Sequence, residues 1–181
     1  MTVTTSYDLL LLAYQALLGT TAAADKVFKP GDWPSQEGQY PLIKMSLPLE
    51  RRVANSRSGA PDFTTTPTIR IIGEVSAPAK VGDAGASDAE IALWALKRQI
   101  EVAIVNSYPL TSKIQHIPTI TSQLDYSSDA ATHLAGIRID IALEFYEGPE
   151  SFAPVESDDL QQVTIANTNL PPTGLSVDLP T

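Results

Sequence analysis

The feature that most constrains this chain is a run of strict alternation late in the sequence. Five apolar residues occupy every second position between polar or small ones: Ile137, Ile139, Ile141, Leu143 and Phe145. Successive side chains of a β-strand point to opposite faces, so the run predicts a strand over residues 134–146 with one fully apolar face. Such a face has to be covered by helices or by a second sheet. The chain must therefore build a layered core.

Three weaker patterns of period two predict further strands over residues 43–49, 67–76 and 117–126. Pro48 has no N–H to donate to a ladder, so we expect the end of the first of these strands at a sheet edge. Gly73 indicates a bulge within the second strand.

Two long loops are expected between these elements, over residues 19–39 and 51–66. The first contains a Pro-Gly-Asp turn at residues 30–32, and its Trp33 is expected to pack on the edge of the core. Loops of this length are uncommon in a compact domain unless they have a function of their own.

Two capping boxes predict helices. Thr5-Ser6-Tyr7-Asp8 begins a helix that runs to Leu18 and stops at Gly19. Ser87-Asp88-Ala89-Glu90 begins a second helix, which ends at Tyr108 because Pro109 disfavours helical geometry in the residue before it. Trp94 within this helix is expected in the core. One helical face carries the apolar residues Leu93, Leu96, Ile100 and either Ala103 or Ile104.

The element order is helix, strand, strand, helix, strand, strand. Strands that come in adjacent pairs favour an antiparallel sheet over a wound parallel one. We therefore expect an α/β fold of the α+β kind, in which two helices cover a four-stranded, mainly antiparallel sheet. Residues 1–148 form this domain, and residues 149–181 form an extended C-terminal arm.

The arm differs from the domain in composition. Residues 147–181 contain six acidic residues and no basic ones, and residues 1–146 contain 15 acidic and 12 basic residues. Short alternating patterns suit strands on either side of a Pro-Pro-Thr-Gly bend at 171–174. We expect an arm that docks on another chain; an arm folded back on its own domain is the alternative. The expected contact residues are Val163, Ile165, Leu175, Val177 and Leu179.

Charge narrows the set of partners. The net charge of −9 argues against a general nucleic-acid binder, because phosphate binding draws on a surplus of Lys and Arg. The only basic cluster comprises Arg51, Arg52 and Arg57. A solvated loop is the plain interpretation of this cluster. The functional one is an interface with acidic groups of a neighbouring subunit or with DNA that passes nearby.

The sequence contains few residues suited to catalysis or metal binding. The chain has no cysteine and only two histidines, His116 and His133. If the last two strands pair, the imidazoles could approach each other and, with Asp125 or Asp129, form a two-His, one-carboxylate site. No metal-ligand spacing supports this arrangement, so surface histidines are the favoured interpretation.

The motifs of calcium-binding, phosphate-binding and nucleophilic sites are also incomplete. The segment around Asp125 and Asp129 lacks the glycine and the closing glutamate of a calcium loop. Gly82 and Gly85 precede a helix, but no Gly-Lys-Ser or Gly-Lys-Thr follows them. No serine lies in a nucleophile elbow. We expect no enzyme, no metal site and no cofactor.

The N-terminal segment superficially resembles a secretory signal, because residues 9–18 are nearly all apolar and three alanines follow at 22–24. No basic residue precedes the run, and it is too short to span a bilayer. We interpret it as a buried helix of a cytoplasmic protein without a membrane partner.

The whole pattern resembles the tail terminator proteins of long-tailed bacteriophages, also called tail completion or minor tail proteins. The similarity covers about residues 1–148 and is a pattern of elements rather than a sharp motif. It is carried by the N-terminal helix, Pro41-Leu42-Ile43-Lys44-Met45 after a long loop, the strand 67–76, the helix with Leu96-Lys97-Arg98-Gln99-Ile100-Glu101, and the final strand from Gly136 to Tyr146.

The resemblance implies a virion protein, assembled in the host cytoplasm, that forms a homo-oligomeric ring of six subunits at the head-proximal end of the tail. Such a ring stops polymerisation of the tail tube protein and presents a surface to the head-tail connector or head-completion protein. It also implies a structural protein without catalytic residues. An acidic chain suits a lumen through which DNA slides without specific binding.

Two other classes stay open. One is a different virion ring component, such as a tail tube or head-completion protein. The other is a small-molecule-binding module or an enzyme, which would show a deep pocket with convergent polar groups.

Overall fold

Five strands form the main sheet of the computed structural model, which describes residues 4–31, 40–57, 59, 61–78, 80, 84–129, 132–153, 162–165 and 175–178. The order across the sheet is β1-β2-β3-β5-β4, and every neighbouring pair is antiparallel except β1 and β2. The strands are β1 (Val27–Phe28), β2 (Leu42–Ala54), β3 (Phe63–Pro78), β4 (His116–Asp129) and β5 (Thr132–Glu147).

The expected mainly antiparallel sheet is confirmed, with one strand more than predicted. β1 is only two residues long, and it pairs with Ile43 and Lys44 of β2. A strand this short carries no alternation, so its sequence predicts a loop.

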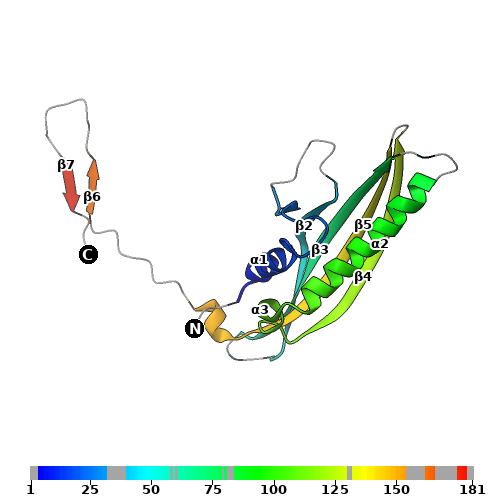
Figure 1. The fold of residues 1–181 in the computed structure, drawn as a ribbon. Helices are drawn as coiled ribbons and strands as arrows, with labels where there is room; N and C mark the ends of the chain where they lie inside the picture. The colour runs from blue at the N-terminus through cyan, green and yellow to red at the C-terminus, as the bar shows by residue number, and fades with distance from the viewer. Residues whose placement is uncertain are drawn as a thin grey trace.

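Helices lie on one side of the sheet (Figure 1). The two main ones are α1 (Ser6–Leu17) and α2 (Ala84–Val105). A single turn, α3 (Tyr108–Thr111), follows α2, and a 3-10 turn, η2 (Pro149–Phe152), follows β5. The α+β class and the order of the main elements agree with the prediction.

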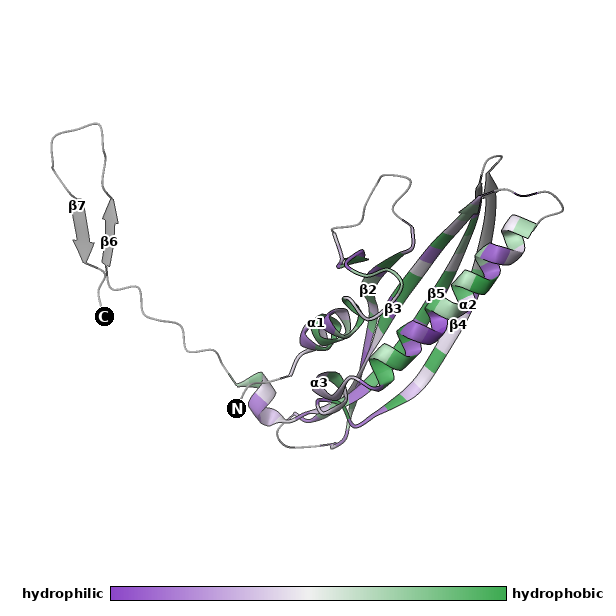
Figure 2. Cartoon of the chain, viewed as in Figure 1, coloured by the Kyte–Doolittle hydropathy of each residue, from purple (hydrophilic) through white to green (hydrophobic). Residues whose placement is uncertain are grey.

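The core lies between the helices and one face of the sheet. The alternating residues of β5 are buried as predicted, and so is the predicted face of α2, with Ile104 rather than Ala103 fully enclosed. Figure 2 shows hydrophobic and hydrophilic residues alternating along the strands beneath the helices. The largest enclosed side chains include Leu9, Leu10, Leu17, Ile43, Met45, Ile69, Ile71, Leu93, Leu96 and Ile100.

The start of α1 confirms the first capping box. The Asp8 amide donates to Thr5 Oγ1 at 3.2 Å, and the Thr5 amide donates to Asp8 Oδ2 at 2.9 Å. Gly19, two residues beyond the helix, has a φ of 71°, a conformation that favours glycine.

The second capping box is wrong. α2 already includes Ala84, so Ser87 and Glu90 lie inside the helix. The first turn is held by tertiary contacts instead. A Cβ on Gly85 would lie 2.3 Å from the Pro78 carbonyl oxygen, and Lys80 pairs with Asp88 at 2.6 Å. Close packing on the end of β3 therefore extends the helix beyond its local signal.

The other end of α2 also differs. The helix ends at Val105 instead of Tyr108, and Tyr108 begins the separate turn α3. Pro109 stands in the first turn of α3, where the missing N–H costs nothing.

The predicted loop over residues 51–66 is wrong at both ends. Residues 51–54 continue β2 and residues 63–66 belong to β3, with Arg51 opposite Thr66 and Ala54 opposite Phe63. Residues 51–54 are exposed, and both strand ends carry few apolar residues. They therefore lack the hydrophobic alternation that marks a half-buried strand.

A register shift does occur in this hairpin, but not at Gly73. It falls in β2 between Ser46 and Leu49, next to Pro48. Gly73 pairs regularly with Ile43 and Ile137. Its missing side chain serves helix packing, because a Cβ there would lie 3.1 Å from Leu96 Cδ2.

β4 and β5 form a long hairpin, and β4 is the last strand of the sheet. α2 packs on β3 and β5. The outermost strand consequently extends past the helix layer and leaves its outer edge unpaired among the described residues.

In the arm, β6 (Gln162–Ile165) and β7 (Leu175–Asp178) pair antiparallel as a separate two-stranded sheet (Figure 1). The two predicted short strands are confirmed, with Val163 opposite Val177 and Ile165 opposite Leu175. Leu179, Trp33 and the bend at 171–174 lie outside the described residues. Whether the arm docks on another chain stays a prediction.

The root of the arm is fixed on the domain. Phe152 of η2 packs edge-on against Phe63 of β3, with ring centroids 5.4 Å apart. No helix in the described part of the chain is long and apolar enough to cross a membrane.

Candidate interaction surfaces

α2 has apolar residues on two opposite sides. Its buried side faces the core, yet four large apolar side chains on the solvent side are between 39% and 66% exposed: Ile91, Trp94, Val102 and Val105. Their spacing of three or four residues places them, with Arg98, along one helical stripe. Trp94 is 47% exposed, so its predicted place in the core is wrong. A helix with two apolar sides has one side left to cover.

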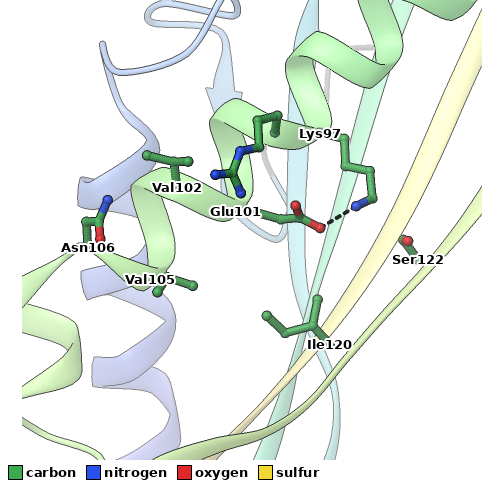
Figure 3. A pocket seen from close by; sticks show the side chains of 8 residues that line it. Lys97, Glu101, Val102, Val105, Asn106, Ile120 and Ser122 are labelled. Atoms are coloured by element: carbon green, nitrogen blue, oxygen red, sulfur yellow. Dashed lines mark hydrogen bonds and ion pairs between the residues drawn. The ribbon is translucent and has the colours of Figure 1, made fainter.

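This stripe borders a groove beside β4, which we call the α2–β4 groove. The groove is lined by Lys97, Arg98, Glu101, Val102 and Val105 of α2, by Asn106 just after the helix, and by Ile120 and Ser122 of β4. Figure 3 shows Lys97, Glu101 and Val105 on the side of the helix nearest Ile120 and Ser122, with Val102 and Asn106 farther away. The groove encloses about 430 Å³ and is open to solvent. The groove exists because α2 packs on β3 and β5 and leaves residues 120–122 of β4 exposed.

Register explains why Ile120 is exposed although it points to the helix side. It pairs with Ile141, whose side chain is buried, and directly paired residues share a face of the sheet. Ile120 nevertheless stays 40% exposed, because the helix layer ends before β4. It forms an apolar floor for the groove.

The groove has a modest positive balance. Lys97 pairs with Glu101 one helical turn away, and its ammonium lies 5.6 Å from the centre of the Trp94 ring. Arg98 is exposed and has no acidic partner among the described residues. It also borders a second hollow with Thr20, between α2 and the loop after α1. The Arg98 guanidinium is therefore available to pair with an acidic group of a partner.

The face of the sheet away from the helices is uncovered but chemically different. Arg70 binds Asp140 with two hydrogen bonds of 2.8 and 3.0 Å, and Lys44 pairs with Glu74 at 2.8 Å. The Asp140 hydrogen bond raises the pKa of Arg70 above its ordinary value. These pairs link neighbouring strands and satisfy each other's charge.

A shallow hollow of about 240 Å³ lies on this open face beside Gly136. It is lined by Ile72, Glu74, Gln123 and Arg138, among others, and Arg138 donates to Gln123 at 2.6 Å. No cluster of three or more potential metal ligands is found among the described residues. The hollow offers neither depth nor convergent catalytic groups.

The base of the sheet holds a buried polar network around Glu147, whose side chain is 7% exposed. Arg52 donates to Glu147 Oε2 at 2.8 Å, and the Thr65 hydroxyl donates to the same oxygen. Glu50 pairs with Arg52 at 2.8 Å and accepts from the Ser6 hydroxyl. The network ties β2, β3, β5 and α1 together.

Two opposing effects act on the pKa of Glu147. Burial alone would raise it, but the hydrogen bonds from Arg52 and Thr65 outweigh burial and hold the pKa below its ordinary value. The carboxylate is therefore charged and satisfied. The same hydrogen bond raises the pKa of Arg52.

The predicted basic cluster is thus divided. Arg52 is engaged within the domain, whereas Arg51 is exposed on the neighbouring position of β2 and Arg57 is exposed in the turn. Adjacent strand residues point to opposite faces, so Arg51 and Arg52 do not act on one partner. Of the expected arm contacts, Val163, Ile165, Leu175 and Val177 lie on β6 and β7.

The two histidines do not meet. β4 and β5 pair as supposed, but the register places His116 opposite Glu144 and His133 opposite Ser128, at opposite ends of the hairpin. His116 Nδ1 lies 3.4 Å from Glu144 Oε1. Asp125 and Asp129 lie on β4 rather than in a loop.

Sequence reasoning missed the α2–β4 groove. A signal was present, since Ile91, Trp94, Val102 and Val105 recur at helical spacing on the side opposite Leu93 and Ile100. No protein-family model matches this chain, and no curated protein matches it, so the interpretation of these surfaces rests on their own geometry.

Proposed function

We propose that this chain is a structural subunit of a homo-oligomeric ring, six copies around, at the head-proximal end of a long-tailed phage tail. The ring ends polymerisation of the tail tube protein and provides the joining surface for the head-tail connector or head-completion protein. The subunit is a virion component assembled in the host cytoplasm, and it performs no catalysis.

The observation that carries the proposal is the presence of two unlike uncovered surfaces on one small domain. The α2–β4 groove lies at one edge of the sheet, and beyond Lys44 the outer edge of β2 is unpaired among the described residues at the other. Rings with cyclic symmetry close through heterologous contacts, in which one patch meets a different patch of the next copy. Two distinct surfaces on opposite edges meet that requirement.

The element order adds support. A helix, a strand pair, a second helix and a second strand pair form the α+β domain that the resemblance to tail terminators implies. The net charge of −9 also suits a lumen that carries DNA without retaining it.

Electron microscopy of the purified protein tests the proposal. We expect single rings of uniform diameter, and long tubes would instead favour a tail tube protein. Deletion of the gene should yield tails of uncontrolled length that fail to join heads. A protein that stays monomeric both in solution and in purified virions would refute the ring.

A further inference from the structure

We infer that the α2–β4 groove receives the C-terminal arm of a second copy, with the β6–β7 hairpin adding to the free edge of β4. The inference rests on the self-association in the proposed function, but not on its place in a phage tail. It names the partner of the groove as a segment of this chain.

The outer edge of β4 and the α2–β4 groove beside it are both uncovered among the described residues. β4 is a 14-residue edge strand, and a long unpaired edge is a template for another strand. Beside it, Val102, Val105 and Ile120 expose 39%, 48% and 40% of their surface. A segment that adds to the edge and covers the groove would satisfy the backbone and bury these side chains together.

The β6–β7 hairpin of the arm is too small to be stable without a further strand. β6 and β7 are four residues each and pair only with each other among the described residues. An isolated two-stranded hairpin is at best marginally stable in water. Ordering the segment costs about 1–2 kcal/mol per residue in backbone entropy, which its own few apolar residues do not repay. A third strand such as β4 would stabilise it.

The length of the tether does not exclude the arm's own domain, and a second copy is chosen because the proposed function already brings copies of the chain together. The end of β5 at Glu147, just before η2, lies six strand positions from Ile141, the partner of Ile120, which corresponds to about 20 Å. A chain as long as residues 154–161 can reach about 28 Å when extended. The tether thus permits pairing within the chain, yet β4 and the hairpin belong to separate sheets.

The charges of the arm and of the groove are complementary. Beyond Glu147, which is paired with Arg52 in the domain, residues 148–181 carry five acidic residues and no basic ones. The groove presents Arg98 without an acidic partner among the described residues. An acidic arm is repelled by other arms and attracted to this guanidinium. We therefore expect an association that weakens as the salt concentration rises.

Disulfide trapping tests the contact directly, because the chain contains no cysteine of its own. Ser122→Cys in the groove is combined with Val163→Cys or, separately, with Thr164→Cys in the arm. Neighbouring positions of a strand face opposite sides, so one of the two pairs should cross-link and the other should not. The expected product is a covalent multimer on a non-reducing gel that returns to monomer on reduction.

Several results would overturn the inference. Ser112→Cys, exposed beyond α3, replaces Ser122→Cys as the matched control and should give no multimer. A cross-link confined to one chain would place the arm on its own domain. Multimers from Ser122→Cys alone would indicate a groove-on-groove contact, and the absence of any cross-link would reject the contact outright.

A second pair of variants distinguishes a loss of the arm–groove contact from a loss of folding and from a loss of the ring. Val102→Asp should weaken self-association about tenfold or more at an unchanged circular dichroism spectrum. Leu18→Asp, at a similarly exposed apolar site just after α1 (41% against 39%) and outside the groove, should not. Normal rings without a cross-link would keep the proposed function and reject this inference. A cross-link in a protein that forms open chains would do the reverse.

Discussion

Replacement of Arg52 by Met should destabilise the domain through the network at the base of the sheet. Methionine keeps much of the aliphatic length of arginine and removes the guanidinium. Glu147 then loses the charged hydrogen bond of 2.8 Å while its side chain stays 7% exposed. The Thr65 hydroxyl is left as its remaining described donor.

The expected cost follows from the exposure of the two partners. Removal of one partner from a fully buried pair costs about 3–5 kcal/mol. Arg52 itself is 45% exposed, so water enters where it stood and screening reduces the loss. We expect about 2 kcal/mol at pH 7, which lowers the melting temperature of a chain of this size by about 4–8 °C.

The pH dependence has a definite sign. In the parent protein the pKa of Glu147 is lowered by Arg52 and Thr65 against the effect of burial, so its stabilising contribution is present above the ordinary value of 4.5. That contribution is lost as the pH falls through the lower, folded-state pKa. In Arg52→Met, only the Thr65 hydrogen bond still opposes the effect of burial, so the pKa of Glu147 rises above its value in the parent protein. The stability difference between the two proteins should therefore shrink in acid.

Urea denaturation followed by circular dichroism measures the effect at pH 7 and at pH 4, at one fixed protein concentration. Arg51→Met is the matched control, since Arg51 is the exposed neighbour of Arg52, and it should change the stability by less than about 0.5 kcal/mol. Equal losses in the two variants, or a loss independent of pH, would refute the reasoning.

Three further substitutions test the fold. Gly85→Ala should destabilise, although alanine normally favours a helix by about 1 kcal/mol, because the added Cβ would lie 2.3 Å from the Pro78 carbonyl; thermal melting decides the sign. Thr5→Ala should cost about 1 kcal/mol by loss of the cap, measured by urea titration. Met45→Ala should cost about 2–5 kcal/mol, whereas Leu49→Ala, 59% exposed beyond the bulge, should cost little.

The elements predicted well are those whose pattern reports burial. The alternation of residues 137–145 and the apolar face of α2 are imposed by one core, so each pattern was sufficient on its own. The cap at Thr5 is local and was also sufficient. Single-sequence reasoning is strongest where the chain meets the core or caps its own backbone.

The failures lie where tertiary contacts act. Ser87 has the sequence of a cap, but Gly85 packs against β3 and the helix extends past it. The ends of β2 and β3 pair beyond the core, so their strand state depends on each other rather than on an apolar face. Neither effect can be predicted from a short stretch of neighbouring residues in the sequence.

The candidate interface shows the same limit. Arg51 and Arg52 are equivalent in the sequence, and only the pairing of β2 with β3 places Arg52 beside Glu147. An interface built from all three arginines is therefore a poorer hypothesis than one built from Arg51 and Arg57. Replacement of the whole cluster would mix a loss of stability with any loss of assembly.

The second apolar side of α2 is hard to explain by the folding of one chain. Ile91, Val102 and Val105 are weaker helix formers than Ala, Glu or Lys, and they contribute little to the core when 39% to 66% exposed. Exposed apolar groups beside an unpaired strand also invite aggregation. A monomer would gain from polar residues at these positions. Their presence is consistent with a surface that is covered in the working state, and the acidic arm is a segment of this same chain that can cover it.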